Sequence, residues 1–123
     1  MYCNYQSVFD EMVTLVPNAN IYEIKKNRDG KIRFPIYINE KLKTTDLDAL
    51  MLSVRANNCL HRAGYRTIGD VVEAIDSFED LKNIRNCGDK SIREITEKVF
   101  CYQYSQLDAS KKIKFIHRVL ELS

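Results

Sequence analysis

The chain has 123 residues, 45% hydrophobic and 29% charged, with a net charge of +2, which is typical of one compact globular domain. This length excludes a barrel or a doubly wound enzyme, and the composition argues against disorder. No apolar run approaches the ~20 residues of a membrane span, and the N-terminus lacks the pattern of a signal peptide. We therefore expect a cytoplasmic protein with no membrane partner.

The small net charge is unevenly distributed along the chain. Residues 1–45 carry seven Lys/Arg and five Asp/Glu, residues 46–102 carry eight and ten, and residues 103–123 carry four and two. The middle segment is therefore mildly acidic, while both ends are basic. Any nucleic-acid contact in the middle segment must come from a local basic patch rather than from a global field.

The N-terminal segment, residues 1–44, predicts a helix followed by a β-hairpin. Apolar side chains recur at helical spacing over residues 5–16. Over residues 21–38 apolar side chains flank a polar turn that ends in Asp29-Gly30, a dipeptide typical of hairpins. Pro35 lacks a backbone N–H and restricts the second strand to a sheet edge.

The rest of the chain predicts short helices, so the expected fold class is mainly α: a compact bundle in residues 45–107 and a C-terminal amphipathic helix in residues 108–123. Four hydroxyl residues each precede an acidic residue by three positions, a helix-capping pattern. These pairs are Thr45 and Asp48, Thr67 and Asp70, Ser77 and Asp80, and Ser91 and Glu94. The predicted helices cover residues 54–62, 70–75, 79–84 and 90–102, with Gly64 and Gly88 in the turns and Ser110 capping the last helix.

Two of the predicted helix starts have features that suit a phosphate. Exposed amides and the positive end of the helix dipole favour an anion there, and Gly88 lets the backbone come close. A helix, a glycine-containing hairpin and a second helix that begins with Lys90-Ser91 form a helix-hairpin-helix-like core. Such modules hold the nucleic-acid backbone without reading its sequence.

Three blocks of sequence carry a family resemblance: Leu-Ser-Val-Arg-Ala-Asn-Asn-Cys-Leu at 52–60, Ala-Gly-Tyr-Arg-Thr-Ile-Gly-Asp-Val-Val at 63–72, and Leu-Lys-Asn-Ile-Arg-Asn-Cys-Gly-Asp-Lys-Ser at 81–91. With these blocks, residues from about 46 to 107 resemble the C-terminal domain of the bacterial RNA polymerase alpha subunit. The resemblance implies a small helical domain that binds the minor groove of A·T-rich DNA. It also implies RNA polymerase, sigma factor and transcription activators as protein partners, and a nucleoid-associated location.

The resemblance further implies a set of DNA-binding residues: Arg55, Asn58, Gly88, Lys90, Ser91 and Glu94. In this set Arg55 enters the minor groove, whose negative potential is concentrated where A-tracts make it narrow. Asn58 lies beside it, and the glycine, lysine and serine meet phosphates. Glu94 helps to hold the arginine, a role compatible with closing the capping box of Ser91.

Two departures from the family pattern limit this interpretation. Asp89 stands where family members usually carry a basic residue, and its carboxylate weakens binding to a phosphate. The loss of one cation also lowers the salt slope of binding by about one unit, and we expect an affinity in the micromolar range or weaker. The 45 residues in front cannot encode the large assembly domain of an alpha subunit, so we expect a free-standing relative.

Two functions stay open on these residues. The protein is a DNA-binding transcription accessory or regulatory protein, or it contacts polymerase, sigma factor or an activator without significant DNA binding. Asp89 and the acidic middle segment favour protein contact, whereas Arg55, Asn58 and Lys90 favour DNA, which we prefer.

An enzyme is not expected, because the chain has no glycine-rich phosphate loop and no nucleophile motif. No cofactor is expected either. The four cysteines, Cys3, Cys59, Cys87 and Cys101, have no C-x-x-C spacing, and the sequence has only two histidines to complete a metal site. We therefore expect reduced, buried thiols and no metal.

Overall fold

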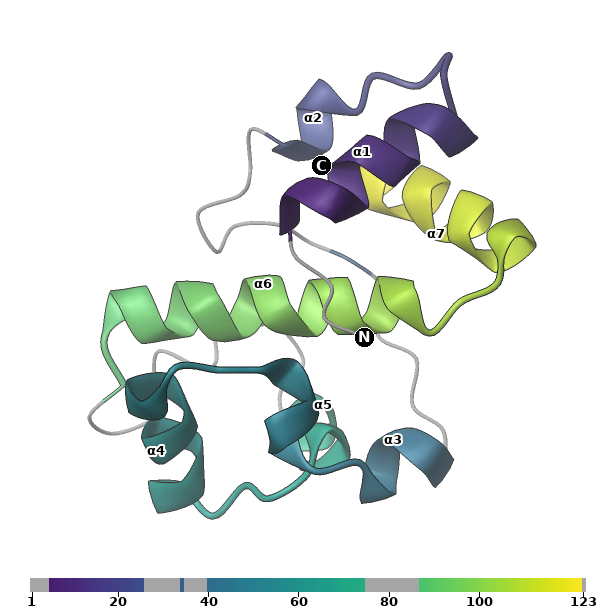
Figure 1. Ribbon diagram of the computed structural model, residues 1–123. Coiled ribbons are helices and arrows are strands. Elements are labelled where there is room, and N and C mark those ends of the chain that lie inside the picture. The colour runs from purple at the N-terminus through teal and green to yellow at the C-terminus, as the bar shows by residue number, and fades with distance from the viewer. Residues whose placement is uncertain (1–4, 26–33, 35–39, 75–86, 123) are drawn as a thin grey trace.

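The computed structural model describes residues 5–25, 34, 40–74 and 87–122, and the fold of these residues is helical (Figure 1). The elements are α1 (Tyr5–Leu15), α2 (Tyr22–Lys25), α3 (Glu40–Thr44), the 3-10 helix η1 (Leu47–Leu50), α4 (Val54–Arg62), α5 (Ile68–Ala74), α6 (Asp89–Ser105) and α7 (Ala109–Leu122). Within the described ranges there is no strand, and one isolated bridge pairs Asp46 with Thr67. The mainly α fold class is confirmed.

The long helix α6 runs through the middle of the molecule (Figure 1). On one side lie α3, η1, α4 and α5; on the other lie α1, α2 and α7. Helix α6 contacts α4 and η1 on the first side and α1 on the second, and α7 packs against α1 and α2. One hydrophobic cluster includes side chains from both sides. A helix covered on both sides is buried over most of its circumference, as expected for a central core helix.

The start of α5 confirms one of the predicted capping pairs. The Asp70 amide donates to Thr67 Oγ1 at 3.0 Å, and the Thr67 amide donates back to an Asp70 carboxylate oxygen at 3.1 Å. The Arg66 amide donates to the same carboxylate at 3.0 Å, and these bonds to the charged form lower the pKa of Asp70. Because Thr67 is the cap, α5 begins at Ile68, two residues before the predicted start.

The predicted caps of η1 and α7 are wrong. At η1 the side chain of Asp46 accepts from the Asp48 amide at 2.8 Å, while Thr45 Oγ1 donates to the carbonyl of Lys41 at 2.6 Å. The Asp46 carboxylate, adjacent to the first turn of η1, therefore caps this helix in place of the Thr45 hydroxyl. At α7 Asp108 accepts from the Lys111 amide at 2.9 Å, which makes Asp108 rather than Ser110 the capping residue. The pair Ser77 and Asp80 and the helix predicted over 79–84 lie outside the described residues.

The β-hairpin prediction is wrong in its first arm, because Tyr22–Lys25 form the helix α2. Ile21 and Ile24 are both buried, whereas Tyr22 is 68% exposed. A spacing of three residues between buried side chains fits a helical turn and does not fit the two-residue period of a strand. The turn at Asp29-Gly30 and the residues 35–38 of the second arm lie outside the described part of the protein.

Aromatic side chains fill the space between α6 and the helices α1 and α7. The Phe100 ring lies 5.2 Å from Phe34 and 5.8 Å from Phe115, measured between ring centroids, and Phe9 lies 6.2 Å away. These are the separations at which aromatic pairs stabilise a core. The N-terminal segment is therefore part of the core.

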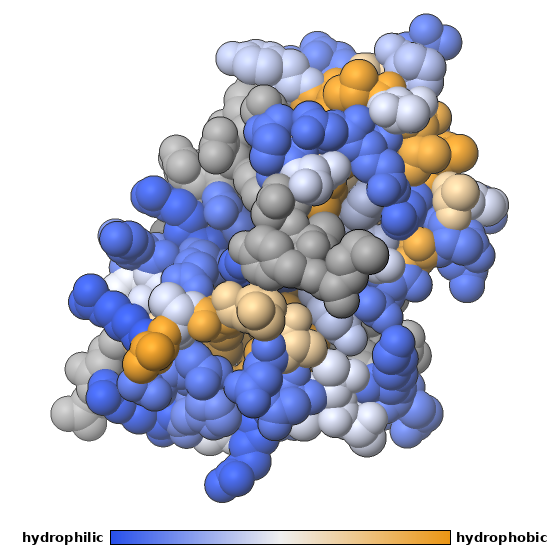
Figure 2. Space-filling view, viewed as in Figure 1, coloured by the Kyte–Doolittle hydropathy of each residue, from blue (hydrophilic) through white to orange (hydrophobic). Residues whose placement is uncertain are grey.

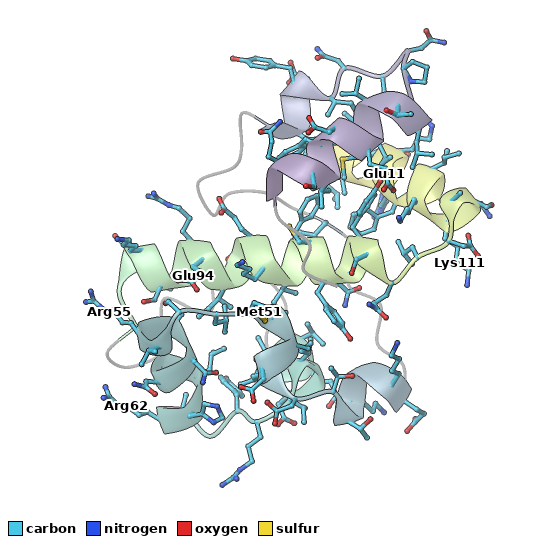
Figure 3. The ribbon with its side chains drawn as sticks, viewed as in Figure 1. Glu11, Met51, Arg55, Arg62, Glu94 and Lys111 are labelled. Carbon is cyan, nitrogen blue, oxygen red and sulfur yellow. The ribbon has the colours of Figure 1, made fainter. Side chains whose placement is uncertain are left out.

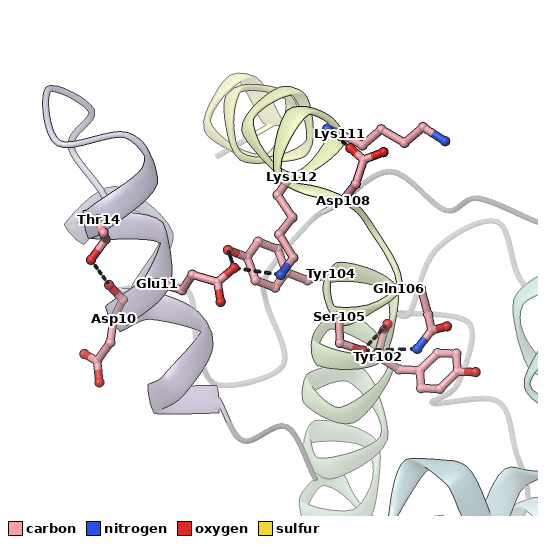
Figure 4. A network of polar contacts seen from close by, with 10 residues as sticks. All are labelled: Asp10, Glu11, Thr14, Tyr102, Tyr104, Ser105, Gln106, Asp108, Lys111 and Lys112. Atoms are coloured by element: carbon pink, nitrogen blue, oxygen red, sulfur yellow. Dashed lines mark hydrogen bonds and ion pairs between the residues drawn. The ribbon is translucent and has the colours of Figure 1, made fainter. Parts of the chain in front are cut away.

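A polar triad of Glu11, Tyr104 and Lys112 lies at the same interface between α1, α6 and α7 (Figure 4). Glu11 on α1 accepts hydrogen bonds from Tyr104 on α6 at 2.9 Å and from Lys112 on α7 at 2.7 Å, and the Lys112 ammonium lies 4.8 Å from the centre of the Tyr104 ring. The Lys112 contact is the main reason that the pKa of Glu11 is lowered. One carboxylate thus links three helices.

None of the helices among the described residues has both the length and the apolarity that crossing a membrane requires.

Candidate nucleic-acid interface

Helix α4 presents Arg55 on its outer face. Ser53 caps the helix by accepting from the Ala56 amide at 3.3 Å. Ala56, Cys59 and Leu60 are buried, on the side of α4 that packs against α6. The 3.6-residue period then turns Arg55 and Asn58 outward, and both are exposed.

Arg62 lies two turns after Arg55 and is also exposed. Figure 3 shows both arginines projecting from α4. Residues seven positions apart share a face of a helix, so the two arginines and Asn58 form one polar stripe. Arg62 was not among the predicted site residues, although its spacing from Arg55 was a signal for it.

Among the described residues, the N-cap of helix α6 supplies no side-chain acceptor for the first-turn amides. Its N-cap is Gly88, which has an extended backbone and offers no such acceptor. A Cβ atom added at Gly88 would meet nothing within 4 Å, so no packing among the described residues requires a glycine there. Lys90 in the first turn is exposed. Uncapped amides, open space and a lysine are the features that an anion needs at a helix start.

The carboxylate of Glu94 joins the starts of the two helices. It accepts from the Ser53 amide at 2.5 Å and from the Ser53 hydroxyl at 2.8 Å, so Ser53 and Glu94 form a clamp between α4 and α6. The capping box predicted for Ser91 and Glu94 is therefore wrong, since Ser91 is the third residue of α6 and Glu94 faces the other helix. Two hydrogen bonds to the Glu94 carboxylate hold Ser53, the N-cap of α4, in place. Ser53 lies two residues before Arg55 in the sequence.

The six predicted site residues are therefore not equally placed. Arg55, Asn58, Gly88 and Lys90 are exposed, Glu94 is half-buried in the clamp, and Ser91 is only 4% exposed. The contact predicted between Ser91 and a phosphate stays a prediction. Within the part of the protein that the structure describes, the Arg55 guanidinium makes no hydrogen bond or ion pair, so its charge is not compensated.

Two further charged features define the limits of this surface. Asp89 is exposed in the first turn of α6, where its carboxylate interacts favourably with the positive end of the helix dipole. It stabilises a helix start that Gly88 leaves uncapped, and it also lies where an anion would bind. Lys111 on α7 lies across α6 from Arg55 (Figure 3), so the basic C-terminal helix does not extend this face.

Ser53, like Arg62, was not among the predicted site residues. It stands in the block Leu-Ser-Val-Arg, and a serine before an apolar run is a capping signal. Its partnership with Glu94, 41 residues later, has no signal of fixed spacing.

The comparisons with known proteins identify relatives of the part of the chain that carries this surface. The family described as the C-terminal domain of the bacterial RNA polymerase alpha chain matches residues 38–100, a range that includes both helix starts. The subunit named DNA-directed RNA polymerase subunit alpha is 36% identical over 93 residues in Clostridium kluyveri and 38% identical over 93 residues in Clostridium perfringens strain 13. Each alignment covers 74% of this chain and 26% of the relative.

The same subunit of Carboxydothermus hydrogenoformans is 36% identical over 76 residues, covering 62% of this chain and 21% of the relative. The matched part thus spans about a quarter of the length of the first two relatives and about a fifth of the third. No solved structure matches this protein significantly.

Proposed function

The protein belongs to the family of C-terminal domains of the bacterial RNA polymerase alpha subunit, and we propose on that premise that it binds A·T-rich DNA in the minor groove and acts in transcription. In this proposal Arg55 enters the groove, and the first-turn amides of α6 together with Lys90 contact the phosphates. The protein then acts where the chromosome is, at the nucleoid. RNA polymerase, sigma factor or an activator are its protein partners.

The observation that carries the proposal is the charge of Arg55, which has no ion-pair or hydrogen-bond partner among the described residues, beside a clamped helix start. An arginine side chain loses rotamer freedom when it is bound, and a fixed backbone reduces what must be ordered on binding. The Ser53–Glu94 clamp supplies that fixed backbone. A narrow A-tract groove concentrates negative potential and attracts such a side chain.

The amides at the start of α6 provide the second anchor. These amides contact no base, but they fix the position and orientation of the domain along the duplex. Contact with two or three phosphates gives a slope of about −2 to −3 when the logarithm of the binding constant is plotted against the logarithm of the salt concentration. Binding of one copy to DNA is then micromolar or weaker.

The test is fluorescence anisotropy with an A-tract duplex and a G·C-rich duplex, each at low and at physiological salt. Arg55→Ala is compared with Lys111→Ala, which removes the same charge from the opposite side of α6. We expect preference for the A-tract, weaker binding in salt, loss of binding in Arg55→Ala and near-normal binding in Lys111→Ala. Equal binding by the two variants would reject the role of Arg55.

A second candidate function, protein contact without significant DNA binding, has one observation in its favour. Val54 is 78% exposed and Met51 is 60% exposed, and both lie within four residues of Arg55 in sequence. Figure 2 shows apolar surface near the start of α4 in an otherwise mostly hydrophilic lower half. Exposed apolar side chains beside a charged residue suit the centre of a protein interface.

A pull-down with purified RNA polymerase tests this alternative. Val54→Asp and Met51→Asp would abolish capture if the apolar residues make the contact, while Lys111→Ala would not change it. Capture that survives both substitutions would count against this surface.

A further inference from the structure

Arg62 is a second exposed cation on α4, and the proposed function does not use it. It lies in the last turn of the helix, and its side chain has no hydrogen bond or ion pair with another described residue. The sequence of α4 contains no acidic residue. No carboxylate on this helix therefore offsets the charge of Arg62 or of Arg55.

Arg62 points to the same side of the protein as Arg55. Seven residues turn an α-helix through about 700°, which is about 20° short of two full turns, and advance it by about 10 Å. Figure 3 shows both arginines projecting toward the side on which α6 begins. The first-turn amides of α6 also point out of that end of the helix. The two arginines and the amides thus face one common surface.

The spacing of these cations is fixed by the fold. The Ser53–Glu94 clamp holds the start of α4 against α6, and the rest of α4 packs on α6 through its buried face. The separation of about 10 Å between Arg55 and Arg62 is close to the length of three base pairs. A duplex carries one phosphate per about 1.7 Å of its axis, so a stretch of this length presents about six phosphates.

We propose that Arg62 binds a phosphate of the duplex that Arg55 enters, about 10 Å from the Arg55 contact. This inference rests on the proposed DNA binding and deepens it, because it makes the ligand a continuous duplex that lies along α4. A phosphate contact carries no sequence information directly. Arg62 therefore adds affinity for every duplex alike, whereas Arg55 supplies the preference for the A-tract.

Arg62 also has a structural effect that must be separated from DNA binding. A cation in the last turn of a helix interacts favourably with the negative end of the helix dipole. This interaction changes the stability of the protein, but it changes neither the salt dependence of DNA binding nor the preference between duplexes. These two quantities are therefore the decisive measurements.

The experiment compares the full chain with three variants by fluorescence anisotropy on the A-tract and G·C-rich duplexes at several salt concentrations. Arg62→Gln keeps a long side chain of similar helix propensity but removes the charge, and Arg62→Lys keeps the charge. Lys111→Gln removes one charge from the opposite side of α6. Circular dichroism and thermal unfolding establish that each variant is folded at the temperature of the binding assay.

For Arg62→Gln we expect binding at least about threefold weaker on both duplexes at low salt, a salt slope shallower by about 0.9, and an unchanged preference for the A-tract. We expect Arg62→Lys to keep the slope of the parent, and Lys111→Gln to bind as the parent does.

Three results would overturn the role of Arg62 while leaving DNA binding intact. They are parent-like affinity and slope in Arg62→Gln, equal losses in Arg62→Gln and Lys111→Gln, and loss of the A-tract preference in Arg62→Gln. The second would mean that only net charge matters, and the third would place Arg62 in the groove rather than on a phosphate. Failure of the parent to bind either duplex rejects the proposed function together with this inference, and the parent alone reveals it.

Discussion

The two sides of α6 differ in how they use their cations. On the side of α1 and α7, the Lys112 side chain is only 18% exposed, bonded to Glu11 and placed over the Tyr104 ring, so its charge serves the packing of the helices. On the side of α4, Arg55 is exposed and has no partner among the described residues. The same type of charge therefore stabilises the fold on one side and is available to a ligand on the other.

The two sides also differ in what holds them to α6. The side that matches the family is joined by aliphatic packing and by the Ser53–Glu94 clamp. The other side is joined by aromatic rings that meet at Phe100, the last residue of the family match. Helix α6 continues to Ser105 and carries Tyr104 to the polar triad. Helix α6 thus packs against the helices inside the range of the family model on one side and against α1 on the other.

The largest effect, a loss of stability, is expected at Phe100, where the two sides of α6 meet. Phe100→Ala removes a fully buried ring that contacts rings from both ends of the sequence, and it should lower the free energy of unfolding by about 3–5 kcal/mol. Urea unfolding followed by circular dichroism measures it. Because one core cluster spans both sides, we expect a single transition in the parent and in the variant. Two separate unfolding transitions in the parent would show that the helices on the two sides of α6 unfold independently.

The next effect concerns the clamp. Ser53→Ala removes an N-cap and one bond to Glu94, and we expect a loss of about 1–2 kcal/mol in the free energy of unfolding and weaker DNA binding. Glu94→Gln keeps the size of the side chain but loses one acceptor oxygen. A double-mutant cycle measures the coupling between the two residues. Additive losses would mean that the clamp does not position α4.

A smaller effect is expected at Asp89. Asp89→Lys replaces a carboxylate with a cation at the start of α6, so DNA affinity should rise several-fold and the salt slope should become steeper by about one unit. The same change loses a favourable interaction with the helix dipole and should cost about 0.3–1 kcal/mol of stability. Anisotropy at several salt concentrations and thermal unfolding measure the two effects, which have opposite signs. A variant with unchanged salt slope would place Asp89 outside the contact.

The smallest effect is expected from Glu11. Its folded pKa lies below the ordinary value of 4.5, so its contribution to stability is present above pH 4.5 and is lost as the pH falls through the folded pKa. The side chain is 46% exposed, and screening by solvent limits the contribution to about 1 kcal/mol or less. Unfolding of the parent and of Glu11→Gln between pH 7 and acid should show converging stabilities, whereas a constant difference would mean that the carboxylate charge is not responsible.

Local signals predicted the parts of the fold that depend on neighbours in sequence. The pair Thr67 and Asp70 forms its capping box, and α4 has the predicted bounds, because both depend on residues within one or two turns. The helix at Tyr22 was missed because a short segment with few apolar residues is compatible with both the helical and the strand period. Only the packing of its side chains in the core decides between the two.

Contacts between distant residues could not be predicted in the same way. Ser53 and Glu94 are 41 residues apart, and Glu11 and Lys112 are 101 apart. Glu94 had a plausible partner in Ser91, three residues away, and only the packing of α4 on α6 makes Ser53 the better one. The family resemblance implied Arg55, Lys90 and Glu94 as site residues, and their role in binding DNA stays a prediction, while the burial of Ser91 depended on the tertiary structure.

The layer order has a consequence for attachments to the protein. The first turn of α1 and the last turn of α7 both lie across α6 from α4 (Figure 1). In the proposed complex, a fluorescent label or a surface tether joined at the end of α7 is therefore held away from a duplex bound at Arg55. In the proposed complex, a dye at the end of α7 would report DNA binding through slower tumbling without touching the nucleic acid.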